Sequence, residues 1–168
     1  NADIPALSGL GSSSTFTVGL FQGIKKLMNI KTTKYENASN AIYIEQNKVG
    51  DHVGLQDQVI ASYGGLNFIK FYKNKKFRVS RINLSNNIKN KINNNFFLVF
   101  TGLQRLANSI TRNQVKKTIS GKNDIYLNKI LDITHQIKSE IYSKNNFDLN
   151  DISKALDEQW YLKKKLEN

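Results

Sequence analysis

A run of small residues near the start of the chain, Gly9-Leu10-Gly11-Ser12-Ser13-Ser14, has the residue types of a phosphate site. Glycine lacks a Cβ, so the backbone can turn tightly and approach a bulky anion. Serine hydroxyls can cap a helix, bind a phosphate oxygen or serve as oxygen ligands of Mg²⁺. Apolar residues at helical spacing follow in Thr15–Met28. The run therefore precedes a helix N-terminus, where unpaired N–H groups and the helix dipole favour anions.

Two interpretations of this run remain open on local physics: a phosphate-binding loop, or a glycine turn that leads into a capped helix. Two familiar phosphate loops do not fit it. A Walker A loop ends in Gly-Lys-Ser/Thr, and no lysine follows these glycines. A dinucleotide-binding fingerprint follows a hydrophobic strand, whereas Pro5 and small residues precede Gly9.

Two carboxylates lie on the helices expected next. Glu45 is near the end of a helix predicted over Lys34–Lys48, and Asp57 begins one predicted from Leu55 to Tyr63. An aspartate in a first turn is favoured by the helix dipole, and a glutamate in a last turn is not. From the pattern alone, Asp57 can be a capping or first-turn residue and Glu45 an exposed one.

The remaining elements are predicted from turn signals and periodicity. Gly64-Gly65 ends the Asp57 helix, and a polar turn then joins two strands. A continuous apolar run further along predicts a buried strand. The expected ranges are strands at 66–72, 77–84 and 96–100, and helices at 85–95, 105–120, 123–143 and from 149 or 151 to 166, the last capped by Asp148 or Asn150.

Composition limits the class of protein. The 168 residues suffice for one domain or two small ones, and the absence of cysteine excludes disulfides and thiolate metal sites. No apolar run reaches membrane-spanning length, so we expect no membrane partner. The net charge of +12 suggests a nucleic-acid-binding protein, but residues 1–66 carry no net charge. The remaining 20 basic and 8 acidic residues are interspersed with many asparagines and isoleucines. We therefore expect no nucleic-acid partner. The chain starts with Asn1, so we expect an upstream segment, and a removed targeting segment stays open.

The string Pro5-x-x-x-Gly9-Leu10-Gly11-Ser12-Ser13-Ser14 resembles the second motif of the GHMP kinases, the galacto-, homoserine, mevalonate and phosphomevalonate kinases. Downstream strings resemble the heptose 7-phosphate kinase and fucokinase-like branch of that family. They are Gly54-Leu55-Gln56-Asp57-Gln58, Gly64-Gly65-Leu66-Asn67, Thr101-Gly102-Leu103-Gln104-Arg105 and the segment Leu156–Lys164.

The resemblance implies an α+β GHMP kinase fold: an N-terminal domain like that of a small-subunit ribosomal protein, and a ferredoxin-like C-terminal domain. Residues 1–83 would be the second half of the ATP-binding domain, and residues 84–168 the first, helix-rich part of the C-terminal domain. The family's first motif, which would precede this stretch, is absent, and its third motif, a glycine-rich loop, has no counterpart after Gly65, so both domains would be incomplete. We therefore expect exposed apolar surface and low stability.

The resemblance also implies residue roles. Gly9, Leu10, Gly11, Ser12, Ser13 and Ser14 would bind the phosphates of ATP, Ser13 and Glu45 would hold Mg²⁺, and Asp57 would be the catalytic carboxylate. Arg105 and Gly65 would bind the substrate, a sugar or sugar phosphate.

The implied activity is ATP-dependent transfer of a phosphoryl group to a sugar hydroxyl, with the anomeric hydroxyl of D-glycero-D-manno-heptose 7-phosphate as the expected acceptor. The enzyme would be cytoplasmic and could be a homodimer. The alternatives are a fucokinase, galactokinase or mevalonate kinase type of enzyme, or a non-catalytic nucleotide-binding fragment.

Overall fold

The computed structural model describes residues 9–51, 53–99, 114–143 and 148–167. The chain divides into two compact units, and each is described by itself. The first contains residues 1–82 and 100–108, and the second contains residues 83–99 and 109–168. The described residues are mostly helical with one two-stranded antiparallel sheet, which agrees with the α+β class. The predicted boundary between residues 83 and 84 stays a prediction.

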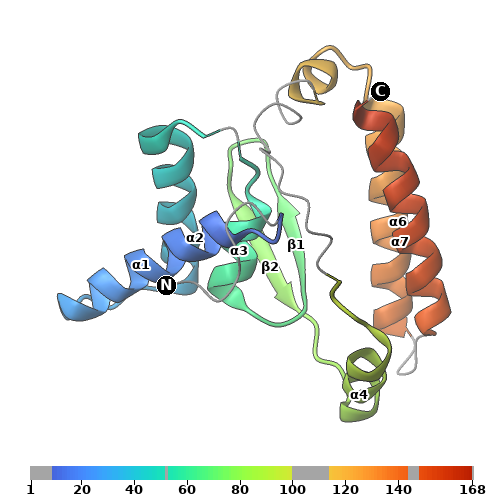
Figure 1. Ribbon diagram of the computed structural model, residues 1–168, viewed down its shortest axis with the longest axis horizontal. Coiled ribbons are helices and arrows are strands. Elements are labelled where there is room, and N and C mark those ends of the chain that lie inside the picture. Colours follow the sequence, from blue (N-terminus) through green and yellow to red (C-terminus); the bar gives the residue numbers. More distant parts are fainter. Residues whose placement is uncertain (1–8, 52, 100–113, 144–147, 168) are drawn as a thin grey trace. The chain divides into compact units, whose positions relative to one another are not determined.

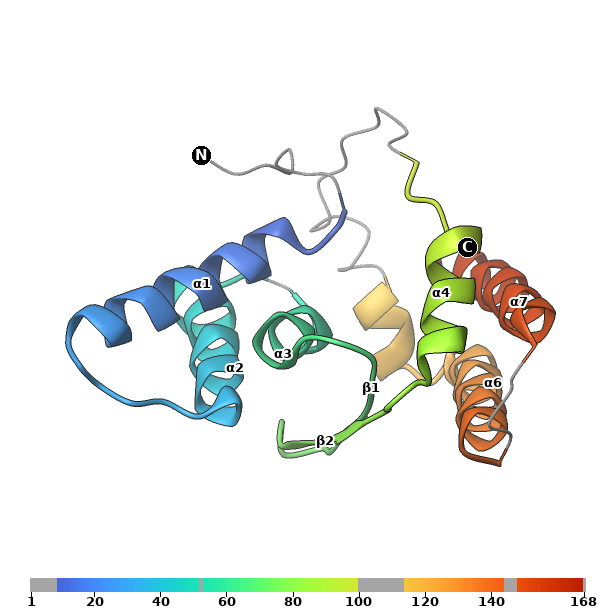
Figure 2. The ribbon, with the colours of Figure 1, turned by 90° about the horizontal axis from the view of Figure 1, so that it is seen from below.

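The first unit is built from three layers (Figures 1 and 2). A hairpin of β1 (Asn67–Phe71) and β2 (Phe77–Arg81) forms one layer, with Asn67 opposite Arg81 and Phe71 opposite Phe77. Helices α2 (Lys34–Tyr43) and α3 (Gln56–Tyr63) pack against each other on this hairpin. Helix α1 (Ser12–Leu27) packs across α2 and α3, on the side away from the strands.

The core of this unit lies between the hairpin and the α2–α3 pair. Ala38 and Val59 are fully buried, Ile42 and Phe77 are 6% exposed, and these four residues form one cluster. The Phe77 ring stacks on Tyr35 with 4.6 Å between centroids and meets Tyr63 edge-on. Because Ala38 and Val59 are small, the hairpin can approach the α2–α3 pair closely.

Local capping fixes where α2 begins. The Thr33 hydroxyl accepts a hydrogen bond from the Glu36 backbone N–H at 3.1 Å, and the Glu36 carboxylate accepts one from the Thr33 backbone N–H at 2.7 Å. This reciprocal pair is a capping box, which satisfies two donors that the helix leaves open. The hydrogen bonds from the backbone and the hydroxyl of Thr33 lower the pKa of the Glu36 carboxyl below its ordinary value.

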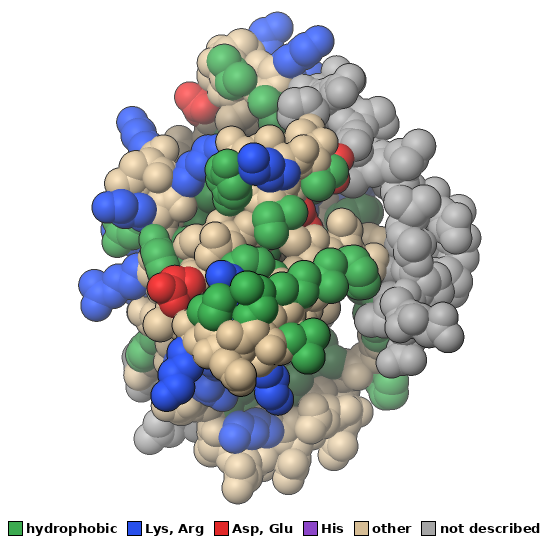
Figure 3. All heavy atoms as spheres, turned by 90° about the vertical axis from the view of Figure 1, so that its left-hand side faces the viewer, with side chains coloured by type: hydrophobic (Ala, Val, Ile, Leu, Met, Phe, Trp, Pro, Cys, Tyr) green, Lys and Arg blue, Asp and Glu red, His purple; other side chains and the backbone are tan. Residues whose placement is uncertain are grey.

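Helix α1 packs one side against the rest of the unit and exposes an apolar side. Ser14 and Val18 are buried on the packed side. Apolar side chains on the other side are exposed, which agrees with the expected exposure of apolar surface; they are Phe16, Leu20, Ile24 and Leu27. Figure 3 views the side of the molecule on which α1 lies and shows hydrophobic side chains gathered there.

The second unit contains α4 (Asn86–Asn95), a short helix at residues 114–119, and the long helices α6 (Asp124–Ser143) and α7 (Leu149–Glu167). Helices α6 and α7 pack together, and Ile133, Leu162 and Leu166 are buried. The side chain of Asn123, 2% exposed, donates to the carbonyl of Leu166. Asp148 accepts a hydrogen bond from the Asn150 N–H at 3.0 Å, as expected for a cap of the last helix.

Two predictions of local structure were wrong. The apolar run from Phe96 was expected to be a buried strand, but residues 96–99 form no strand, and Phe97 is 82% exposed. An apolar run indicates a preference for burial without supplying a partner strand, and no strand in the described residues pairs with it. The helix expected over Lys34–Lys48 changes at Ile44 into a π-helical turn, η1 (Ile44–Val49), which Gly50 ends at φ +79°.

No helix in the described ranges is both long and apolar enough to span a membrane. Arg105 and the residues 101–104 before it lie outside the described residues, as does His52.

Candidate functional site

The glycine–serine run leads directly into α1. Gly9 and Gly11 have φ values of +75° and +68°, in the left-handed region that favours glycine. Gly11 is the N-cap, and the first turn of α1 has neither a side-chain cap nor an acidic residue. The first intrahelical bond runs from the Thr15 N–H to the Gly11 carbonyl at 2.9 Å. The N–H groups that precede it in the first turn have no acceptor within the helix, so this end of α1 can bind an anion.

Asp57 lies against the same loop. It is in the first turn of α3, and its carboxylate faces the backbone of Gly11. A Cβ added to Gly11 would come within 3.1 Å of Asp57 Oδ2 and 3.2 Å of Cγ. Any side chain at position 11 would therefore occupy space beside the carboxylate. The positive end of the α1 dipole favours a negative charge at this place.

Glu45 borders the loop from another direction. It is the second residue of η1, and its side chain is only 2% exposed. Ser14 Oγ donates to Glu45 Oε2 at 2.9 Å, and Thr17 Oγ1 donates to Glu45 Oε1 at 2.9 Å. Gln58 Nε2 also donates to Oε2. Burying a carboxylate is unfavourable unless donors surround it, and here two helices supply them.

The oxygen groups around the first turn of α1 suit a hard cation. Hydroxyls and carboxylates are the ligands that Mg²⁺ prefers, and the buried Glu45 carboxylate and the Asp57 carboxylate both lie beside this turn. The Ser13 side chain is exposed, and Ser14, the next residue, is the serine that contacts Glu45. Leu10 and Ser13 face solvent, whereas Ser12 is half-buried.

Gly65 lies apart from Asp57. It follows the C-terminal end of α3, and Asp57 is in the first turn, so about 9 Å of helix lies between them. Gly65 has φ +73°, and the Arg81 guanidinium would lie 3.4 Å from an added Cβ. The Asn67 side chain donates to the carbonyls of Gly64 and Gly65 and closes this turn.

Sequence reasoning gave no role to Thr17 or to the side chain of Gln58. A signal for Thr17 was present, because it lies three residues after Ser14 and therefore shares a helix face with it. Ser14 and Thr17 are both polar residues on the side of α1 that carries Val18. Gln58 gave no such signal, since a polar residue in the first turns of a helix is ordinarily exposed.

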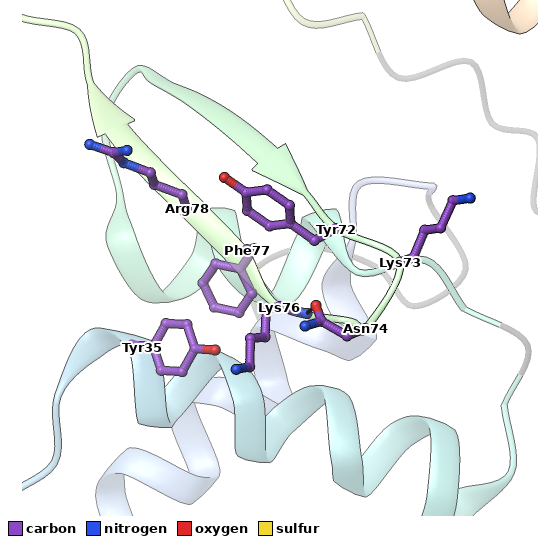
Figure 4. Close-up of a pocket in the computed structure, with 7 residues that line it drawn as sticks. All are labelled: Tyr35, Tyr72, Lys73, Asn74, Lys76, Phe77 and Arg78. Atoms are coloured by element: carbon purple, nitrogen blue, oxygen red, sulfur yellow. Dashed lines mark hydrogen bonds between the residues drawn. The ribbon is translucent and has the colours of Figure 1, made fainter.

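A separate hollow lies at the turn of the hairpin (Figure 4). Its volume is about 710 Å³, and no residue of the glycine–serine run lines it, nor do Glu45 or Asp57. Figure 4 shows the Tyr35 and Phe77 rings side by side and the Lys73 side chain pointing away from them. The lining cations, Lys73, Lys76 and Arg78, are exposed side chains, so this hollow is distinct from the candidate site and has no buried polar group among its lining residues.

Comparison with known proteins gives a family match for the part of the chain that contains this site. Residues 1–65, which contain the glycine–serine run, Glu45 and Asp57, match the family model "GHMP kinases N terminal domain". These residues correspond to a GHMP kinase N-terminal domain. Members of the GHMP kinase family are ATP-dependent phosphotransferases. The three groups that meet at the first turn of α1 all belong to this GHMP domain.

Two curated relatives extend the likeness of this chain beyond residue 65. A D-glycero-alpha-D-manno-heptose 7-phosphate kinase from Campylobacter jejuni is 31% identical over 97% of this chain and 47% of its own length. A bifunctional fucokinase/GDP-fucose pyrophosphorylase from Arabidopsis thaliana is 24% identical over 99% of this chain and 16% of its own length. The chain thus spans less than half the length of either relative.

Proposed function

We propose that the complete protein is an ATP-dependent sugar kinase that phosphorylates the anomeric hydroxyl of D-glycero-D-manno-heptose 7-phosphate. The observation that carries this proposal is the meeting of Asp57, Glu45 and the glycine loop at the first turn of α1. The likeness to a heptose 7-phosphate kinase over nearly the whole chain supports the acceptor.

The loop binds the phosphates of ATP in this proposal. Phosphoryl transfer depends mainly on positioning and on neutralising negative charge, and a helix N-terminus without a side-chain cap can contribute to both. Glycine at position 11 leaves the space that a side chain would fill, between the loop and the Asp57 carboxylate. We assign phosphate contacts to Gly9, Leu10, Gly11, Ser12, Ser13 and Ser14.

Glu45 and Ser13 would hold Mg²⁺, which neutralises phosphate charge when bound. The burial of Glu45 and its donors Ser14 and Thr17 keep its carboxylate beside the first turn of α1. The exposure of Ser13 leaves its hydroxyl accessible from solvent.

Asp57 would orient the acceptor hydroxyl or accept its proton. Its position against Gly11 supports this role, because the carboxylate then lies beside the phosphate loop. Arg105 and Gly65 are the remaining acceptor contacts in the proposal, with Arg105 pairing with the sugar phosphate through two parallel hydrogen bonds.

An L-fucose type of acceptor is the second candidate. The likeness to the fucokinase-containing relative covers 99% of this chain, and it favours this alternative over a galactokinase or mevalonate kinase. Both candidates share the same phosphate chemistry and differ only in the acceptor.

The test is a panel of acceptors offered to the complete protein with ATP and Mg²⁺. We expect ADP release with heptose 7-phosphate and a fall in kcat of about 10²–10⁴-fold in Asp57→Asn, the usual effect of losing a general base. Asp132→Asn, an exposed aspartate on α6, is the matched control and should retain full activity. Turnover of fucose alone would select the second candidate. The absence of turnover with every sugar, or unchanged activity in Asp57→Asn, would refute the proposal.

A further inference from the structure

The Gln58 side chain has no role in the proposed reaction, although it is fully buried. It follows Asp57 directly on α3, and its amide nitrogen donates to Glu45 Oε2. One turn of α3 therefore presents a carboxylate to Gly11 and an amide to Glu45. Gln58 is hydrogen-bonded to Glu45 and is the sequence neighbour of Asp57, so α3 links the two carboxylates.

The orientation of this amide is set by the charge of Glu45. With Nε2 directed at the carboxylate, Gln58 Oε1 is buried and has no hydrogen-bond partner in the described part of the chain. An unpaired acceptor in the interior is unfavourable. The opposite orientation would place an oxygen against the carboxylate oxygen, so the donor is required at Glu45. An apolar side chain would fill the same volume without an orphaned oxygen, so packing alone does not account for a glutamine here.

Thr17 completes the arrangement from the other helix. It donates to Glu45 Oε1, whereas Ser14 and Gln58 donate to Oε2. The terminal torsion of a free glutamate is broad. Donors on both oxygens, from α1 and α3, restrict the carboxylate to one plane.

We propose that Gln58 and Thr17 are positioning residues that fix the Glu45 carboxylate in the orientation used for Mg²⁺ and its nucleotide. This inference rests on the proposed function, because it gives Glu45 a metal to bind. Gln58 and Thr17 would touch neither the metal nor the reacting atoms. Partners that orient a metal ligand usually contribute a factor of about 10–100 in metal affinity.

The test compares binding of a non-hydrolysable ATP analogue to the complete protein with and without Mg²⁺. In Gln58→Leu and Thr17→Val, the ratio of these two affinities should fall about 10–100-fold, while the affinity without Mg²⁺ is retained. Binding of Mn²⁺ to the nucleotide-loaded protein, followed by electron paramagnetic resonance, should weaken by the same factor. The controls are Gln56→Leu and Thr15→Val, exposed residues two positions earlier on the same helices.

The outcomes separate the two hypotheses. A wild-type protein that binds the analogue equally well with and without Mg²⁺ would refute the proposed function and this inference with it. A wild-type protein that depends on Mg²⁺, with variants that keep the same ratio, would overturn only the positioning role. A purely structural role would lower the melting temperature and both affinities together. If Gln58→Leu does not fold, Thr17→Val still decides, since it removes one hydroxyl at nearly constant volume.

Discussion

Gly11→Ala is the substitution whose effect the geometry defines most sharply. Alanine would have to adopt φ +68°, which costs about 1–2 kcal/mol for a residue with a Cβ. Its Cβ would also lie 3.1 Å from Asp57 Oδ2, closer than the ordinary contact range that begins at 3.4 Å. The carboxylate must therefore move by a few tenths of an ångström, out of the position from which we propose that it orients the acceptor hydroxyl.

Gly50→Ala is the matched control, because Gly50 has no role in the proposed site. Gly50 has φ +79°, and an added Cβ would meet no atom within 4 Å. Both variants should lose about 1–2 kcal/mol of stability from the backbone term, which lowers the melting temperature by roughly 2–8 °C. Only Gly11→Ala should also displace Asp57, and small displacements of a catalytic group can reduce kcat by about 10²-fold.

Thermal melts and steady-state kinetics of the complete protein measure the two effects separately. The double variant Gly11→Ala with Asp57→Ala should recover part of the stability, because the contact is removed, and the two changes should not be additive. Equal losses of kcat in Gly50→Ala and Gly11→Ala would refute the reasoning, since the Asp57 contact would then have no effect.

Two further predictions concern stability. The hydrogen bonds of the capping box lower the Glu36 pKa in the folded state, so their contribution is fully present above the ordinary value of 4.5 and is lost as pH falls through the lowered pKa. Denaturant titrations of wild type and Glu36→Gln from about pH 6 to pH 3 should show this loss in wild type alone. Phe77→Ala should cost about 3–5 kcal/mol by emptying the core, whereas exposed Phe97→Ala should stay within about 0.5 kcal/mol in the same melts.

The sequence predicts local elements well where the signal is local. The start of α2 follows from Thr33 and Glu36, whose spacing is that of a capping box. The hairpin is predicted by two runs of residues that favour β-strands, one on each side of a polar turn. The start of α1 is predicted by two glycines followed by a helical pattern. Each of these signals lies within a few residues, so no knowledge of the tertiary structure is needed.

The features that the sequence did not predict depend on residues that are far apart in the chain. The surroundings of Glu45 come from residues 28 and 31 positions earlier and 13 positions later, and no local pattern indicates that they converge. For the exposed run from Phe96, the sequence shows that the run is hydrophobic but does not show whether another strand pairs with it. The family resemblance implied separate roles for Glu45 and Asp57, and only the packing of α1 on α3 brings them to the same turn.

The π-helical turn η1 also bears on how such a site can vary among related chains. A turn of this kind holds more backbone than an α-helical turn, so it can take up one additional residue between two fixed anchors. In a helix that stayed regular, one inserted residue would instead rotate every side chain beyond it by about 100°. The number of residues that separates Glu45 from Asp57 can therefore drift by one across evolution while the carboxylate keeps its place. A sequence alignment that requires a constant number of residues between these two positions would therefore miss the equivalent glutamate.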